Sequence, residues 1–282
     1  MNPTAPPAAA HRAAVLGAPI AHSLSPVLHR AAYAAMGLPG WSYDRFEVDE
    51  AALPGFLHGL DRAAWAGLSL TMPLKRAVIP LLDDITPTAA SVEAVNTVVF
   101  GADGRRRGDN TDIPGLLAAL HERGITTVPS AAVLGAGATA SSALAALARI
   151  CTGEVTAYVR GPERAAQMRQ WGERLGVAVR TADWADAGRA LHEPLVVATT
   201  PAGAADHLAA AVPDRPGALF DVLYHPWPTP LAAAWSARGG PVLGGLDLLV
   251  HQAVLQIEQF TGRTGVPLAA MRAAGEAALA AR

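Results

Sequence analysis

The chain has 282 residues, of which 51% are hydrophobic, and a chain of this length is expected to form two domains rather than one. Its formal net charge of −2 gives no electrostatic reason to bind nucleic acid or an anionic membrane. The single cysteine, Cys151, excludes an internal disulfide framework and is typical of a reducing compartment, so we expect a cytoplasmic protein.

The first half of the chain predicts strands that alternate with helices and therefore a mostly parallel sheet. The first eleven residues, rich in Ala and Pro, predict a disordered tail rather than a signal peptide. Ser25 before Pro26 predicts a helix N-cap. The expected elements are strands at 15–17, 42–48 and 66–71, helices at 25–36, 51–60 and 73–83, and a hairpin joining 94–100 to 105–109.

The second half repeats this alternation, starting with a helix from Thr111 to about Arg123. The apolar stretch 131–150 is interrupted by Gly and Ser, so we expect no membrane span. The expected elements that follow are strands at 131–134, 154–159, 177–179, 195–198 and 218–222 and helices at 139–150, 247–261 and 267–281.

A glycine-rich turn lies between the strand 131–134 and its helix and matches the dinucleotide fingerprint G-x-G-x-x-(G/A). Gly135 makes the tight turn, Gly137 lets the backbone approach a pyrophosphate, and Ala140 lets the helix pack closely. The helix N-terminus offers its N–H groups to the phosphates. The cofactor-binding residues predicted at this turn are Gly135, Ala136, Gly137, Ala138 and Thr139.

The end of the next strand predicts which dinucleotide binds. An acidic residue usually stands there in an NAD site, whereas this chain has Arg160, with Arg164 one helical turn later. Both can pair with a 2′-phosphate, which favours NADP(H). The alternative is that both are ordinary surface cations, with Glu163 as the acid of an NAD site.

Lys75 is the only lysine among 22 cationic side chains. A residue type that is kept at one internal position is a candidate for chemistry that arginine cannot perform, because lysine can lose its proton near neutrality. The alternative is that Lys75 stands on a solvated face without a role.

Four segments outside the nucleotide unit concentrate polar groups, and they contain Lys75, Asn96 and Asn110: 17–26, 67–75, 94–97 and 108–112. This set, followed by the glycine-rich turn and by 221–226 and 245–252, closely resembles the shikimate dehydrogenase family from about Gly17 to Thr261.

The resemblance implies an oxidoreductase of aromatic amino acid biosynthesis, which uses NADPH to reduce 3-dehydroshikimate reversibly to shikimate. It implies an α/β fold with an N-terminal α/β substrate domain, 1–111 completed by 248–282, and a Rossmann-type doubly wound dinucleotide-binding domain, 112–247. The implied substrate residues are Ser23 and Ser25 at the carboxylate, Lys75, Asn96 and Asp112 around the reacting oxygen, and Thr71, Tyr224 and Gln252; Val222 and Gly245 match positions near the nicotinamide.

Hydride transfer to a ketone leaves negative charge on oxygen, so a cation or proton donor is needed there. Lys75 stands in the first turn of its predicted helix, where the dipole disfavours a cation and favours loss of its proton. Asp112 would hold Lys75 and share in proton transfer, as the second catalytic residue. The alternative for Asp112 is a helix N-cap, and the same alternative applies to Ser25.

The resemblance is not complete, and other interpretations stay open. Ser69, Val159 and the pair Asp247-Leu248 depart from the family pattern. The alternatives are a quinate or aminoshikimate dehydrogenase and, in another class, a noncatalytic NADP-binding regulatory protein. We interpret His22 and His29 as structural and expect no metal site. A small-molecule substrate is expected, and the sequence leaves open a monomer or a homodimer.

Overall fold

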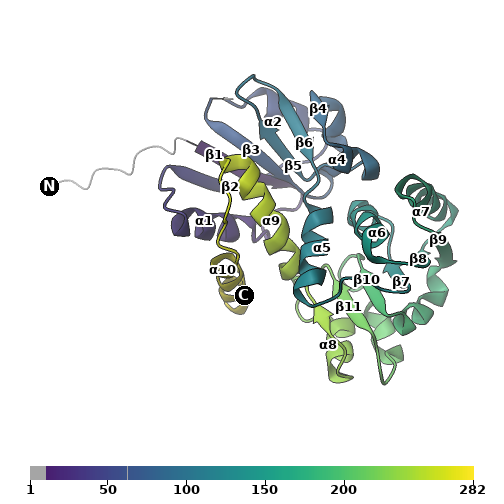
Figure 1. Ribbon diagram of the computed structural model, residues 1–282. Coiled ribbons are helices and arrows are strands. Elements are labelled where there is room, and N and C mark those ends of the chain that lie inside the picture. The colour runs from purple at the N-terminus through teal and green to yellow at the C-terminus, as the bar shows by residue number, and fades with distance from the viewer. Residues whose placement is uncertain (1–10, 62) are drawn as a thin grey trace. The chain divides into compact units, whose positions relative to one another are not determined.

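The computed structural model describes residues 11–61 and 63–282 (Figure 1). The tail predicted for the first eleven residues lies, except for His11, outside the described residues. Contacts divide the chain into two compact units, Met1–Ala89 with Val95–Thr111 and Ala253–Arg282, and Ala90–Ala94 with Asp112–Gln252. Each unit contains one six-stranded sheet with helices, as expected of an α/β protein.

The first unit is built on a mixed sheet with the order β2-β1-β3-β5-β6-β4. β1 pairs in parallel with β2 and β3, whereas β5 is antiparallel to both β3 and β6. The antiparallel pair β5 and β6 is the predicted hairpin. The strands are β1 His11–Gly17, β2 Trp41–Glu47, β3 Trp65–Leu70, β4 Asp84–Ile85, β5 Thr97–Phe100 and β6 Arg106–Asp109.

The helices of the first unit cover this sheet because the central strands β1 and β3 are apolar and buried along most of their length. α1 packs against α10 (Figure 1). The elements are α1 Ser25–Ala35, α2 Leu53–His58, α3 Leu74–Ala77, the 3₁₀ helix η1 Ile79–Leu81, α10 Leu268–Ala280, and two helices whose residues are divided between the units, α4 Pro87–Val92 and α9 Gly245–Thr261.

The second unit is built on a fully parallel sheet with the order β12-β11-β10-β7-β8-β9. Numbered within the unit, this order is 6-5-4-1-2-3, which is the doubly wound dinucleotide-binding topology. The strands are β7 Ala131–Leu134, β8 Val155–Val159, β9 Val179–Asp183, β10 Leu195–Ala198, β11 Ala218–Asp221 and β12 Val242–Leu243.

Both faces of the second sheet are covered, and the alternation along β7 illustrates the reason. Val133 belongs to the core cluster that includes α6, whereas Ala132 and Leu134 belong to the cluster that includes Trp235 of α8. Successive side chains of a strand point to opposite faces, so each face needs its own layer. The helices of this unit are α5 Asp112–Glu122, α6 Ala138–Ile150, α7 Pro162–Leu175, η2 Trp184–His192, η3 Asp206–Ala211 and α8 Pro230–Ala237.

Two local predictions were wrong. The helix predicted over 73–83 is a single turn, α3, followed by η1, since Pro80 lacks the N–H that would continue an α-helix. The strand predicted at 177–179 is β9, which begins only at Val179.

Within the described residues, no helix combines the length and the apolar content that crossing a membrane requires.

Candidate active site

A loop with two buried serines precedes α1 in the first unit. Ser23 and Ser25 are 7% and 4% exposed. The predicted N-cap role of Ser25 was wrong, because Leu24 occupies the N-cap position and no side chain caps the helix. Instead, the backbone N–H of Ser25 donates to Ser23 Oγ at 3.3 Å. Ser25 is therefore not the N-cap of α1.

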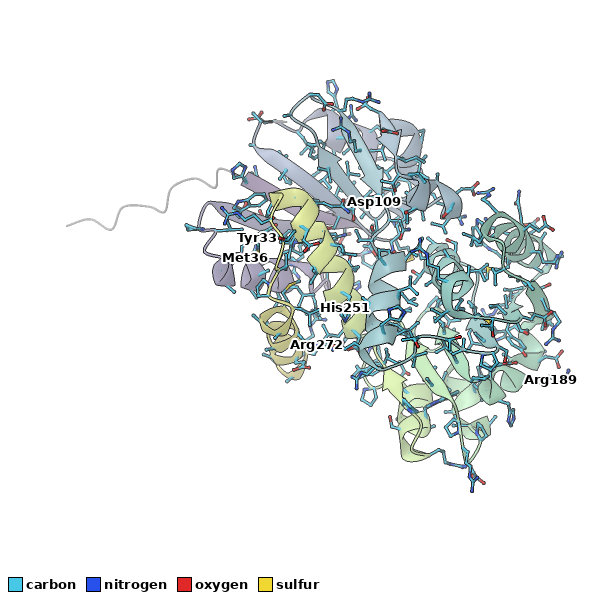
Figure 2. The ribbon with its side chains drawn as sticks, in the orientation of Figure 1. Tyr33, Met36, Asp109, Arg189, His251 and Arg272 are labelled. Carbon is cyan, nitrogen blue, oxygen red and sulfur yellow. The ribbon has the colours of Figure 1, made fainter. Side chains whose placement is uncertain are left out.

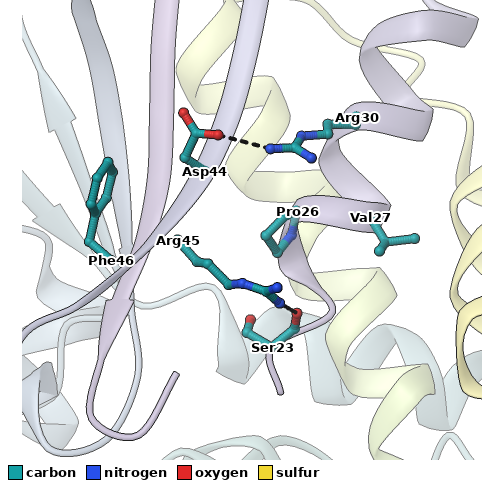
Figure 3. A pocket seen from close by; sticks show the side chains of 7 residues that line it. All are labelled: Ser23, Pro26, Val27, Arg30, Asp44, Arg45 and Phe46. Atoms are coloured by element: carbon teal, nitrogen blue, oxygen red, sulfur yellow. Dashed lines mark hydrogen bonds and ion pairs between the residues drawn. The ribbon is translucent and has the colours of Figure 1, made fainter. Parts of the chain in front are cut away.

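Arg45 on β2 fixes the same serine loop, and sequence reasoning missed it. Its guanidinium donates to the backbone carbonyl oxygen of Ala21 at 2.6 Å. It also donates to that of Ser23 at 3.4 Å (Figure 3). Nothing in the sequence sets Arg45 apart, because it is one of many arginines. The pairing of β1 with β2 brings it near this loop. A pocket of about 510 Å³ lies beside this loop, lined by Ser23, Pro26, Val27, Arg30, Asp44, Arg45 and Phe46.

Three predicted residues of the first unit are anchored by neighbouring backbone hydrogen bonds. The N–H of Thr71 donates to the Leu16 carbonyl at 3.0 Å, and the Lys75 carbonyl accepts from Val95 at 2.8 Å. The carbonyl of Asn96 accepts from Leu70 at 2.8 Å. These bonds join the end of β1, the end of β3 with the segment that follows it, and the segment before β5. Lys75 itself is half-buried on the single turn α3, so the argument from a long helix dipole loses its basis.

The side chain of Asn96 is 2% exposed and its amide is held in place by Thr111 and Thr97. Nδ2 donates to Thr111 Oγ1 at 2.9 Å, while Oδ1 accepts from the Thr111 N–H and from Thr97 Oγ1, both at 2.8 Å. These neighbours of the first unit hydrogen-bond both ends of the amide.

A buried polar network beneath these residues was also missed. The Tyr43 hydroxyl donates to Ser69 Oγ at 2.7 Å, and Ser69 donates to Gln256 Oε1 at 2.7 Å. Gln256 Nε2 donates to Thr97 Oγ1 at 3.0 Å and to the Asn96 carbonyl at 3.2 Å. The one available signal was the spacing of Gln252 and Gln256, which places both on one face of a helix. Ser69, a departure from the family pattern, is thereby explained as a relay between Tyr43 and Gln256.

Three predicted substrate residues belong to the second unit, and two of them, Asp112 and Gln252, are buried. Asp112 is 5% exposed and is the first residue of α5, not an N-cap of a helix near Pro114. Gln252 is 5% exposed, and its Nε2 donates to the Leu249 carbonyl at 2.8 Å.

The glycine-rich turn joins β7 to α6 as predicted. Gly135 has φ +117°, and a Cβ there would lie 2.6 Å from Thr199 Oγ1, so only glycine fits. Gly137 is the N-cap of α6, and no side chain caps the helix. The first N–H groups of α6, from Ala138 onward, are therefore left for a ligand, as dinucleotide phosphates require.

The two predicted phosphate-binding arginines flank the start of α7. Arg160 directly follows β8 and is exposed. Arg164 lies in the first turn of α7 and donates to Gln167 Oε1 at 3.1 Å, a neutral partner that leaves its charge in place. Glu163, the acid of the alternative NAD interpretation, is an exposed residue of that same turn.

The end of β11 brings together Val222 and Gly245, the two residues expected near the nicotinamide. The N–H of Gly245 donates to the Leu223 carbonyl at 2.9 Å, and a Cβ at Gly245 would overlap the Val222 carbonyl. Tyr224 follows in the same loop and is half-buried. Asp247, a departure from the family pattern, accepts from the Gly244 N–H at 2.9 Å and so stabilises the start of α9.

A doubly wound parallel sheet with a glycine-rich turn, together with a second α/β unit that holds buried polar groups, defines a two-unit dinucleotide-binding protein of the dehydrogenase type. The family model for the shikimate dehydrogenase substrate binding domain matches residues 15–98, and that for the shikimate 5′-dehydrogenase C-terminal domain matches 245–274.

Similar proteins agree along nearly the whole chain. The shikimate dehydrogenase (NADP(+)) of Methylobacterium radiotolerans is 40% identical over 261 residues, covering 89% of this chain and 91% of that protein. The crystal structure of Mycobacterium tuberculosis shikimate dehydrogenase is 42% identical, with a TM-score of 0.85 and coverage of 95% and 99%. The Thermus thermophilus shikimate 5-dehydrogenase in complex with NADP(H) and shikimate is 36% identical, with a TM-score of 0.82 and the same coverage. The chain belongs to the shikimate dehydrogenase family.

Proposed function

We propose that this protein reduces 3-dehydroshikimate to shikimate with NADPH, reversibly. The observation that carries the proposal is that the chain has a site for each reactant. The N-terminus of α6 after Gly135 has no side-chain cap, which suits a dinucleotide. The buried polar cluster around Asn96 lies next to the segment that contains the only lysine. Family membership and the named activity of the relatives support the same reaction.

The residues present fit NADP(H). The α6 N-terminus offers N–H groups to the pyrophosphate, and Arg160 and Arg164 offer cationic donors to a 2′-phosphate. Gly245 and Val222 would lie along the nicotinamide. A bound NADPH supplies the hydride that adds to the ketone carbon of the substrate.

We assign the substrate carboxylate to the serine loop. Ser23 and Ser25 carry hydroxyl donors, and Arg45 holds two carbonyl groups of the loop so that Ser23 is presented in one orientation. Thr71, Tyr224 and Gln252 complete the proposed substrate contacts.

We assign proton transfer to Lys75 and Asp112. As the hydride adds to the carbonyl carbon, the oxygen gains an electron pair, and the Lys75 ammonium donates the proton that turns it into a hydroxyl. Asp112 is the proposed partner that orients Lys75 and returns a proton to it. Asn96, fixed by Thr111 and Thr97, donates toward the same oxygen.

The experiment is a matrix of three acids and two cofactors. NADPH oxidation with 3-dehydroshikimate, and NADP⁺ or NAD⁺ reduction with shikimate, quinate and an aminoshikimate, are measured by absorbance. The proposal requires shikimate with NADP⁺ to have the highest kcat/KM. A higher value for quinate or with NAD⁺ would overturn the substrate or cofactor assignment, and no turnover of any pair would favour a noncatalytic protein.

A further inference from the structure

Arg160 and Trp184 stand at the same edge of the second sheet. Each is the first residue after a strand, and β8 and β9 are adjacent parallel strands in which Val159 pairs with Asp183. Because the carboxyl ends of parallel strands meet at one edge, the two residues that follow become neighbours. The guanidinium carbon of Arg160 lies 5.2 Å from the centre of the Trp184 ring, within the range of a cation–π contact.

Trp184 packs against the core of the second unit. The indole is half-buried against the core cluster that includes Leu191, and its centroid lies 6.0 Å from that of the His207 ring in an edge-to-face arrangement. Asp183 caps η2, the helix that Trp184 begins, by accepting from the Ala185 N–H at 2.8 Å. These contacts hold the indole in one position.

The charge of Arg160 remains available for a ligand. In the described part of the chain, its guanidinium has no carboxylate within ion-pair distance, unlike Arg189 of η2, which pairs with Asp186 at 3.7 Å. A guanidinium carries its N–H donors along its edge, in its own plane. A guanidinium whose carbon lies over an indole can still offer these edge donors to a phosphate, which accepts from two at once.

We infer that Trp184 is a positioning residue that selects NADP(H) over NAD(H) by holding Arg160 in place for the 2′-phosphate. The inference rests on the proposed function for its cofactor, and it adds a residue that lies outside the G-x-G-x-x-(G/A) fingerprint. Ordering Arg160 before the ligand arrives lowers the entropic cost of binding. The effect is confined to nucleotides that carry a 2′-phosphate.

The test uses fragments of the cofactor, so that it does not depend on turnover. Binding of 2′,5′-ADP and of 5′-AMP to the full chain is measured by calorimetry for the wild type, Trp184→Ala, Arg160→Ala and the double variant. We expect Trp184→Ala to weaken 2′,5′-ADP roughly two- to fivefold and to leave 5′-AMP unchanged. In the Arg160→Ala background, Trp184→Ala has no further effect.

Two further variants serve as controls. Trp184→Phe keeps an aromatic face on a fold that Trp184→Ala could disturb, and it recovers part of the 2′,5′-ADP affinity. Arg189 lies on the same helix, η2 (Figure 2), and its side chain is 80% exposed. Arg189→Ala removes this charge and leaves the selectivity unchanged.

Several outcomes would overturn the inference. The first is that Trp184→Ala loses the same affinity for 2′,5′-ADP and for 5′-AMP. The second is that Trp184→Ala weakens 2′,5′-ADP binding just as much when Arg160 is already Ala. The third is a wild type that does not bind 2′,5′-ADP more tightly than 5′-AMP. A selective wild type that turns over no 3-dehydroshikimate would instead overturn the proposed function and leave the role of Trp184 intact.

Discussion

Gln256 of α9 accepts a hydrogen bond from the hydroxyl of Ser69 on β3 at 2.7 Å, across 187 positions of the chain. The same amide donates to Thr97 and to the carbonyl of Asn96. The C-terminal segment is thereby tied to the sheet that carries the proposed substrate residues. The proposed active site thus depends on a residue that need not touch substrate.

Replacing Gln256 by Leu tests this tie. It removes the partner of the Ser69 hydroxyl and of Thr97 in a buried setting, and an unsatisfied buried group costs about 1–3 kcal/mol. We expect urea unfolding to show a loss of about 2–3 kcal/mol in the free energy of unfolding. Gln259→Leu on the same helix, which loses only a part-buried bond to Asp109, is the control with the smaller loss. Equal losses in both variants would contradict a special role for Gln256.

Arg45→Met tests the serine loop. The variant removes the donor to the carbonyl groups of Ala21 and Ser23 and keeps the aliphatic stem. Because the loop is proposed to bind the substrate carboxylate, we expect KM for 3-dehydroshikimate to rise about tenfold, about 1.4 kcal/mol, with kcat changed less.

The matched control for Arg45 is Arg30→Met. Arg30 lines the same pocket but pairs with Asp44 at 2.8 Å and does not hold the loop (Figure 3). Its KM should stay near that of the wild type. A similar rise in both variants would point to diffuse charge rather than to loop geometry.

His29 makes the stability of the fold depend on pH. Burial lowers the pKa of His29 from 6.5 to about 3, where the ring stacks on Tyr43 at 3.8 Å between centroids. The folded protein therefore keeps the imidazole neutral, whereas the unfolded chain binds a proton below pH 6.5. The contribution of His29 to stability is full above about pH 6.5 and falls as the pH drops toward 3.

A His29→Phe variant isolates this contribution. The difference in free energy of unfolding between wild type and variant should shrink by about 1.4 kcal/mol per pH unit below 6.5, the value for one proton. Denaturant unfolding at about pH 7.5, 6 and 5 measures it. A pH-independent difference would show that His29 titrates alike in both states.

The second sheet was predictable because its strands are short apolar runs separated by turn signals. Strands β7, β8, β10 and β11 are almost wholly buried, and Gly135 follows β7 directly. β9 lies at the edge of the sheet and is half-exposed, so its sequence contains no apolar run and its position was misjudged. α7 escaped notice for a related reason, since only Met168, Trp171 and Gly172 of its residues are buried.

The site was predictable only where a residue type was itself unusual. Lys75 and Asn96 stand out in a chain with one lysine and three asparagines. Arg45, Gln256 and Trp184 do not stand out, because their roles come from strand register and from contacts between distant segments. Ser25 was assigned a capping role by local pattern, and the geometry of the loop gave the N-cap position to Leu24 instead.

The most direct test of the central claim is the turnover of 3-dehydroshikimate by Lys75→Ala, measured beside its affinity for NADPH. We predict that the variant folds and binds NADPH with unchanged affinity while kcat falls about 10²- to 10⁴-fold, because the proton donor is lost. Lys75→Arg, which keeps the charge and cannot release the proton, should not restore the rate. Turnover near that of the wild type in Lys75→Ala would contradict the assignment of Lys75 to proton transfer.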